Sequence, residues 1–203
     1  MAKVRTVETL RNIIGSPNQQ VPLKIHRELN ARAIEFIGRS PMFMLATSDA
    51  AGRPTVSPKG DLPGFVQVEG SHTLLIPERK GNKLVFSLTH ILENPHVGLI
   101  FLVPGTSETL RVQGTAELID DADRRATLAA RGNPALLITC VTVTECYFHC
   151  AKAFLRSDLW KPATWPEKVA ISFGEEIAQS GGLQREAIAE FDRAVGERYK
   201  TDL

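Results

Sequence analysis

The sequence predicts a mainly β fold of the α+β type, a small closed or half-closed antiparallel barrel with helices at both ends. Six or seven short apolar or alternating runs lie between residues 42 and 154, separated by clusters of turn-forming residues. Few of these runs are followed by a segment with helical periodicity, which argues against a doubly wound parallel sheet. We therefore expect one domain over residues 1–203, with the barrel at about 40–157 and helical extensions at 5–39 and 160–200.

Two helices are predicted before the first strand. Residues 6–14 form a short helix with Thr6 as N-cap and Gly15 at its end, because a threonine hydroxyl can accept from a free helical N–H and glycine tolerates the terminal conformation. A longer helix is predicted over residues 23–39, since apolar residues recur there at helical spacing.

The strands are predicted from runs bounded by turn signals. Pro58 cannot donate a ladder hydrogen bond, so we expect it at a bulge or a strand end. The predicted strands cover residues 42–47, 53–57, 65–69, 73–77, 97–103, 109–119 and 136–154, and the last is expected to bend.

Four further helices are predicted among and after the strands. The first covers residues 82–92, with Asn82 as its cap, and the second covers residues 120–131, which begin with acidic side chains. After the last strand the pattern is helical again, over residues 167–179 and 183–198.

The composition is that of a soluble globular protein, with 43% hydrophobic and 23% charged residues, which excludes a disordered or fibrous chain. There are 24 Lys and Arg residues against 23 Asp and Glu residues, a formal net charge of +1. Such a balance argues against a bulk electrostatic grip on nucleic acid or on an anionic membrane. It leaves room for a small cationic pocket.

The three cysteines predict neither a disulfide framework nor a metal site. Cys140, Cys146 and Cys150 lie within eleven residues and are odd in number. On a strand their spacing places them on one face, with His149 on the other, so we expect core cysteines, with Cys150 the nearest to a functional site. The chain has no apolar signal region and no run of about 18 apolar residues, so we expect a reduced, cytoplasmic protein.

Motifs for nucleophilic or metal chemistry are absent from the sequence. There is no G-x-S-x-G, H-E-x-x-H or C-x-x-C pattern, no P-loop and no G-x-G-x-x-G. Ser57 is followed by Pro58 rather than by a helix, so it does not resemble the nucleophile of a hydrolase. The residues therefore give no catalytic assignment.

Phosphate binding is better supported, because cationic residues recur near turns and strand ends. Residues 77–83 place three cations and a glycine directly before a predicted helix. Arginine offers a planar fork of donors, and the start of a helix offers free N–H groups. A solvated basic turn is the alternative. The recurring cations are Arg53, Lys59, Arg79, Lys80, Arg111, Lys152 and Arg156.

Several segments together resemble a known family. Over about residues 30–165, and in the family's order, the chain is similar to the pyridoxamine 5′-phosphate oxidase-like FMN-binding split-barrel family. The last of these segments resembles one FMN-dependent branch of the family. The segments are Arg53–Gly60 (RPTVSPKG), Ile76–Asn82 (IPERKGN), Asn94–Phe101 (NPHVGLIF), Leu110–Ala116 (LRVQGTA) and His149–Ser157 (HCAKAFLRS) with Trp160.

The resemblance implies a six-stranded split barrel and a homodimer that holds two FMN molecules in clefts between the subunits. Arg79 and Lys80 match the pair that grips the FMN phosphate, assisted by Asn82 and Lys83. The other implied flavin contacts in the same subunit are Arg53, Val56, Ser57, Pro58 and Lys59 on the second strand, and Arg111 or Gln113 on a later one. The partner subunit is expected to contribute Lys152, Arg156 and Trp160.

This assignment agrees with the residues, because cations near the phosphate and the pyrimidine edge would hold FMN and raise its potential. The family's C-terminal segment with a tryptophan and an arginine-rich stretch is replaced here by two helices, and residues 120–131 lack the tyrosine of a pyridoxal phosphate pocket. We therefore predict an FMN-dependent oxidoreductase of unknown substrate. The alternatives are a flavin- or haem-binding protein for storage or sensing, and a deazaflavin-dependent reductase.

Overall fold

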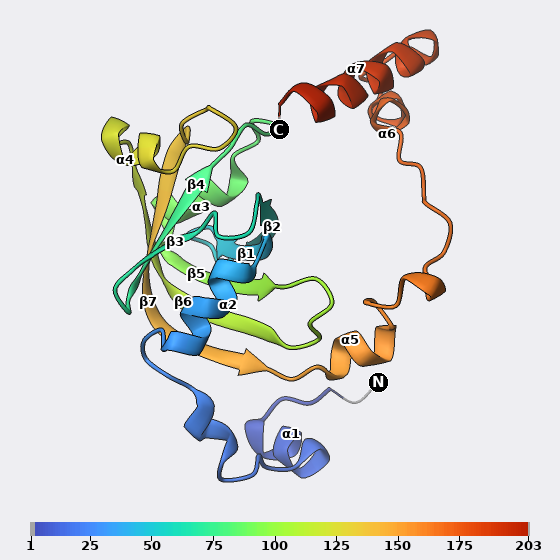
Figure 1. Cartoon of the computed structure of the whole chain (residues 1–203). Coiled ribbons are helices and arrows are strands. Elements are labelled where there is room, and N and C mark those ends of the chain that lie inside the picture. The colour runs from blue at the N-terminus through green and yellow to red at the C-terminus, as the bar shows by residue number, and fades with distance from the viewer. Residues whose placement is uncertain (1–2, 203) are drawn as a thin grey trace.

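The computed structural model describes residues 3–202, and its centre is one antiparallel sheet of seven strands (Figure 1). The strand order is β2-β1-β5-β6-β7-β4-β3, and each neighbouring pair is antiparallel. The strands are β1 Met42–Ser48, β2 Pro54–Gly60, β3 Gln67–Glu69, β4 Thr73–Glu78, β5 His96–Leu102, β6 Thr109–Ile119 and β7 Leu137–His149.

Helices flank the sheet in sequence and cover part of it. α2 packs against β6 and β7, and α3 packs against β1. The helices are α1 Val7–Ile14, η1 Val21–Lys24, α2 Ala31–Arg39, α3 Phe86–Glu93, α4 Ala122–Thr127, α5 Lys152–Ser157, η2 Pro162–Thr164, α6 Phe173–Gln179, η3 Arg185–Ala187 and α7 Ile188–Thr201. Among the described residues, no helix is long and apolar enough to cross a membrane.

The mainly antiparallel fold predicted from the sequence is confirmed, with one difference in the strand count. The sheet has seven strands rather than the six of the expected barrel, because the three-residue β3 adds to β4 at one edge. The first helix forms as predicted: the Thr6 hydroxyl accepts from the N–H of Thr9 at 3.1 Å, and Gly15 ends the helix with φ at +86°. β6 spans the predicted residues 109–119.

The long helix predicted over residues 23–39 is wrong in its first half. His26 pairs instead with Cys146 of β7 through two backbone hydrogen bonds, of 2.9 and 2.8 Å. α2 begins only at Ala31, where the Asn30 side chain accepts from the N–H of Ala33 at 3.0 Å. Pairing with the sheet and an asparagine cap therefore outweigh the helical spacing of the apolar residues.

The other helices are shorter than predicted or begin later. α3 begins at Phe86 rather than at Asn82, whose side chain accepts from the N–H of Leu84 at 3.0 Å within the loop. α4 is a short helix capped by Asp121, α6 begins only at Phe173, and α7 runs from Ile188 to Thr201.

Two predictions about strands are corrected. Pro58 lies inside β2, opposite Met44, and not at a bulge or strand end. Its missing N–H is tolerated because β2 is an edge strand. β7 ends at His149, so the last part of the predicted strand 136–154 becomes α5.

The cysteines do not share one face, because β7 contains a bulge. Gln113 of β6 pairs with Glu145 and Gly114 pairs with Val143, so Thr144 is an extra residue. Beyond the bulge the faces exchange: Cys140 packs in a smaller cluster on one side and Cys146 in the main core on the other. Both are buried as predicted, whereas Cys150 is exposed.

In residues 3–202 the buried apolar core lies between Leu29 and Cys146. Its centre includes Phe43, which contacts Phe101 at 4.9 Å and Phe65 at 5.8 Å between ring centroids. We call residues 29–150 the sheet body. Helices α6 and α7 lie away from it, at the end of an extended linker (Figure 1).

Candidate functional site

The cationic loop that the sequence singled out joins β4 to α3 and begins with an oriented arginine. Arg79 Nε donates to Asp61 Oδ2 at 2.9 Å, and Arg131 Nη1 lies 3.5 Å from the other oxygen of the same carboxylate. Asp61 is buried, so it fixes the guanidinium of Arg79. Arg79 Nη1 is buried without a hydrogen-bond partner among residues 3–202. The Arg79 side chain as a whole is 25% exposed, so an acceptor outside the described chain can reach the open part of the guanidinium.

A buried ion pair beside this loop joins the two halves of the sheet. Lys59 of β2 donates to Glu78 of β4, and Thr139 of β7 donates from its hydroxyl to the other oxygen of Glu78 at 2.8 Å. β2 and β4 stand on opposite sides of the sheet order, so the sheet curls to bring them together. Lys59 therefore stabilises the fold next to Arg79, and Glu78 is its partner.

The loop itself adopts a backbone conformation that side chains rarely take. Lys83 and Val85 have φ of +63° and +48°, and a β-branched residue in this left-handed region is strained. Val85 is the N-cap of α3, whose first turn leaves backbone N–H groups without helical partners. Strained loops of this kind cluster at binding sites, and this one presents Lys80 and Lys83 beside a helix start.

The charges around the loop leave a cationic surplus. The buried side chains of Asp61 and Glu78 are already engaged, and within residues 3–202 Lys80 pairs only with the exposed carboxylate of Asp202, at 3.7 Å. The five cations gathered here are Lys59, Arg79, Lys80, Lys83 and Arg131. An anion with several acceptor oxygens, such as a phosphate, fits this set of donors.

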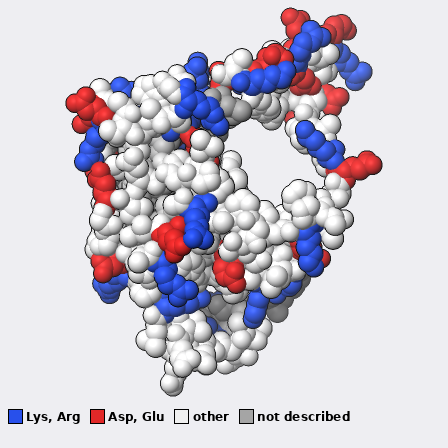
Figure 2. All heavy atoms as spheres, viewed as in Figure 1, with Lys and Arg blue, Asp and Glu red and all other residues white. Residues whose placement is uncertain are grey.

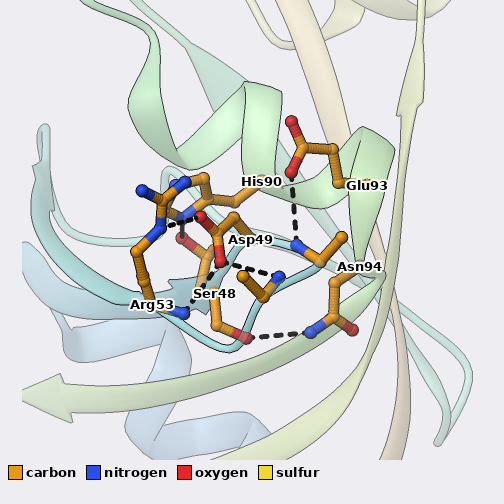
Figure 3. Close-up of polar contacts among 9 residues, drawn as sticks. Ser48, Asp49, Arg53, His90, Glu93 and Asn94 are labelled. Carbon is orange, nitrogen blue, oxygen red and sulfur yellow. Dashed lines mark hydrogen bonds and ion pairs between the residues drawn. The ribbon is translucent and has the colours of Figure 1, made fainter.

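Arg53 stands at the opposite end of β2, in the turn between β1 and β2 (Figure 3). Its Nε donates to Asp49 Oδ2 at 2.6 Å, while Asp49 Oδ1 accepts from the N–H groups of Ala51 and Arg53 at 3.0 and 2.8 Å. The backbone N–H of Arg53 is the largest cause that holds the pKa of Asp49 below its usual range. Along a strand, Arg53 and Lys59 are about 20 Å apart, so they cannot hold one phosphate together.

The same turn is fastened to the end of α3. Asn94 donates to the Ser48 hydroxyl at 2.8 Å, and Glu93 accepts from the N–H of Ala50 at 3.2 Å (Figure 3). The Thr47 hydroxyl lies 3.3 Å from His90 Nδ1. These contacts give the Arg53 region a structural role, in addition to any contact with a ligand.

The β2 residues predicted along the flavin divide between two faces. Val56 and Pro58 are exposed on one face, and Ser57 and Lys59 are partly buried on the other. On the exposed face, Pro58 begins a row across β1 and β5 to Arg111 of β6. With neighbouring strands about 4.8 Å apart, this row is about 14 Å long. The row is Pro58, Met44, Ile100 and Arg111, and the next is Val56, Ala46, Gly98 and Gln113.

Arg111 and Gln113 border this face from β6. Arg111 Nε is buried without a partner within the described part of the chain, and Gln113 donates to Glu145 at 2.9 Å. Burial, followed by the positive charges of Arg111 and Lys24, lowers the pKa of His149. The row of residues that begins at Pro58 therefore ends at a cationic side chain, that of Arg111.

The residues expected from a partner subunit lie on and after α5. Trp160 donates from its indole to the carbonyl of Thr106 at 2.8 Å and stacks on Phe154 at 5.6 Å between ring centroids. Lys152 and Arg156 are exposed. α5 lies at the end of the molecule opposite the β4–α3 loop (Figure 1). Within one chain these residues do not reach the loop, and their role in a partner's site stays a prediction.

Sequence reasoning missed the acids that organise the cations. Asp61 and Glu78 were available as signals, since Asp61 follows the β2 motif and Glu78 directly precedes Arg79. Thr139 and Arg131 gave no local signal. Thr139 reaches the site through the pairing of β4 with β7, and Arg131 reaches it through a turn. No group of three or more His, Cys, Asp or Glu side chains in residues 3–202 is placed to hold a metal ion.

Several solved structures are similar to about 60% of this chain. The chain resembles the solved structure of a HupZ variant from Group A Streptococcus, with 18% identity over 60% of this chain and 99% of that one, and a TM-score of 0.49. It also resembles a protein of Lactobacillus delbrueckii proposed to be a pyridoxamine 5′-phosphate oxidase, with 26% identity, coverage of 60% and 95%, and a TM-score of 0.46.

A further similar structure is that of HutZ, the heme storage protein from Vibrio cholerae, with 18% identity, coverage of 59% and 93%, and a TM-score of 0.38. No match was found among curated proteins. The family model described as pyridoxamine 5′-phosphate oxidase matches residues 29–150, the range of the sheet body. The chain therefore belongs to the pyridoxamine 5′-phosphate oxidase family.

Proposed function

We propose that the protein binds FMN and uses it as an oxidoreductase, as a homodimer with its two flavin sites between the subunits. The observation that carries the proposal is the Arg79 guanidinium, which Asp61 orients while Nη1 stays buried and unpartnered. A phosphate oxygen would accept from the part of this guanidinium that stays exposed. Membership of the family supports the choice of a flavin phosphate.

The residues around the loop fit the phosphate end of FMN. Lys80 and Lys83 add charge at the surface, and the start of α3 offers backbone donors. FMN, when bound, supplies hydride or electron transfer from its own ring system. The protein binds and orients the cofactor, so no acid–base pair or nucleophile is required.

The exposed face of β2 fits the ring end. Val56 and Pro58 offer an uncharged surface. Arg111 lies at the other end of the row that begins at Pro58, and its Nε is buried without a partner in the described part of the chain. The positive charge of Arg111 would attract negative charge on the ring of the bound cofactor. This face is open in one chain, which supports a second subunit as its cover, with Lys152, Arg156 and Trp160 as the residues contributed in trans.

The test compares FMN with riboflavin, which has the same ring but no phosphate. In a fluorescence titration the wild-type protein is expected to prefer FMN. Arg79→Ala/Lys80→Ala should weaken FMN binding about 100-fold or more, since each charged hydrogen bond contributes about 1.5–3 kcal/mol. The same variant should leave riboflavin binding unchanged.

Arg124→Ala is the matched control, because it removes an exposed cation outside the loop. Its preference for FMN should equal that of the wild type. Equal FMN affinity in the wild type and in Arg79→Ala/Lys80→Ala would refute the phosphate assignment. A protein that ignores FMN and takes up haem or a deazaflavin would refute the choice of cofactor.

A further inference from the structure

Two segments outside the sheet body leave apolar side chains uncovered. We call residues 3–28 the N-terminal arm and residues 158–202 the C-terminal arm. α1 buries no residue, and Val7, Ile13 and Ile14 are 67–72% exposed. In the C-terminal arm, Val169 and Ile171 are 74% and 67% exposed. Clustered apolar exposure of this kind marks a surface that another molecule covers.

The C-terminal arm ends in a helical hairpin that is ordered by its own contacts. Asp192 of α7 accepts from the Ser172 hydroxyl at 2.5 Å and from the N–H of Gly174 at 2.8 Å, which caps α6. A Cβ on Gly174 would lie 2.9 Å from the carbonyl oxygen of Ile188, so the two helices are in close contact. The hairpin is therefore a preformed unit.

The hairpin nevertheless stands apart from its own sheet body. The Trp160–Thr106 hydrogen bond holds the start of the arm, and the Lys80–Asp202 pair is at its end. Between these points the linker runs free, and the space-filling view shows an opening through the molecule (Figure 2). The apolar linker residues Val169 and Ile171 therefore stay largely exposed in one chain.

The two arms carry opposite charge. The N-terminal arm contains five basic and two acidic residues, whereas the C-terminal arm contains nine acidic and six basic residues. α1 and α7 lie at opposite ends of the molecule (Figure 1). One chain therefore cannot bring them together in this arrangement, whereas two chains can.

A groove beside the N-terminal arm could bind an acidic segment. It has a volume of about 620 Å³ and lies between α2, residues 24–30 and the turn from β5 to β6. Lys24, Arg32 and Arg39 supply cations, against the carboxylates of Glu35 and Glu108. Its wall includes Phe36 and Phe148, whose rings meet edge to face at 5.4 Å.

We propose that the C-terminal arm of one copy docks on the N-terminal arm and the groove of a second copy, and that the contact is repeated reciprocally. In a dimer with a two-fold axis, the same contact forms twice, once from each copy to the other. The acidic hairpin meets the basic segment, and the apolar linker residues cover apolar residues of the partner. The inference rests on the homodimer of the proposed function. It assigns to the two arms the contacts that hold this dimer together, and we call this pair of contacts the clasp.

A charge exchange tests the pairing in the full-length chain. Lys24→Glu/Arg32→Glu makes the groove acidic, and Glu190→Lys/Glu197→Lys makes one face of α7 basic, since the two positions are seven residues apart. Each variant alone should raise the dimer dissociation constant at least tenfold in sedimentation equilibrium at low salt. An equimolar mixture should restore dimers, because each reversed surface then meets its complement.

Arg124→Glu, on α4 outside both surfaces, is the control and should leave dimerisation unchanged. Val169→Asp/Ile171→Asp should also raise the dissociation constant at least tenfold without changing the urea midpoint of the sheet body. A monomeric wild-type protein, or charge-exchanged variants that dimerise as tightly as the wild type, would overturn the proposal.

The two proposals fail in different ways. If the clasp is wrong but the function is right, the wild type binds FMN and the charge-exchanged variants dimerise normally. If the function is wrong but the clasp is right, no FMN binds, and the mixture of variants still restores the dimer.

Discussion

The sheet body and the two arms are built in opposite ways. Of the residues that the structure describes, all buried large apolar ones lie between Leu29 and Cys146, and in the arms the only buried one is Gly174. Ion pairs follow the same division: Lys59–Glu78 is buried, whereas Lys161–Asp158 and Lys200–Glu197 are exposed. Stability within one chain is therefore concentrated in the sheet body, and the arms depend on a partner for their burial.

The sharpest contrast is in the cost of removing an apolar side chain. Phe43→Ala should lower the free energy of unfolding by about 3–5 kcal/mol, because Phe43 is fully buried between two other aromatic rings. Ile13→Ala on α1 should change it by less than about 0.5 kcal/mol under monomeric conditions. Urea unfolding measures both, and a large effect of Ile13→Ala in the monomer would break the comparison.

The ion pairs should differ in the same direction. Glu78→Ala leaves Lys59 largely buried without its carboxylate, and we expect a loss of about 3 kcal/mol in urea unfolding. Lys59→Met/Glu78→Leu should recover most of this loss, because no charge is then left buried. Glu197→Ala, which breaks an exposed pair, should cost less than about 0.5 kcal/mol. Equal losses at the two sites would contradict the division.

Two carboxylates extend the comparison to acid. Hydrogen bonds, chiefly from the N–H of Arg53 and from the Ser172 hydroxyl respectively, lower the pKa of Asp49 and of Asp192. Each stabilises the fold above the pKa of the unfolded chain, about 4, and this contribution is lost as the pH falls through the lowered pKa. Asp49→Asn should flatten the acid dependence of sheet-body unfolding, whereas Asp192→Asn should affect only the helicity of the arm, as followed by circular dichroism.

The smallest expected effect is a change in the pKa of His149, at the end of β7 in the sheet body. Burial and the charges of Arg111 and Lys24 lower the pKa of His149. Because the unfolded chain then binds the proton more readily, the associated stability is lost as the pH falls below about 6.5. Arg111→Gln should raise the pKa of His149, as measured by NMR. An unchanged pKa would show that the charge of Arg111 does not act on His149.

Local signals predicted most of the sheet body and the first helix of the N-terminal arm. The Thr6 cap, the span of β6 and the antiparallel sheet follow from residue type and alternation within short windows. Errors arose where distant parts of the chain decide the outcome. His26 pairs with Cys146 far along the sequence, and the Thr144 bulge reverses the faces of β7. Neither is visible from periodicity.

The candidate site shows the same limit. The cations of the β4–α3 loop could be predicted because they are adjacent in sequence, before a helix. Their orientation could not, since Asp61 and Thr139 reach them only through the curled sheet. Assignment of Lys152, Arg156 and Trp160 to a partner's site needs a second chain, which no property of one sequence places.

The most direct test of the central claim is a fluorescence titration of FMN with the wild-type protein, carried to stoichiometry. We expect flavin quenching or a spectral shift that saturates at one FMN per chain, two per dimer. A protein that leaves the fluorescence of FMN unchanged at every concentration would contradict it.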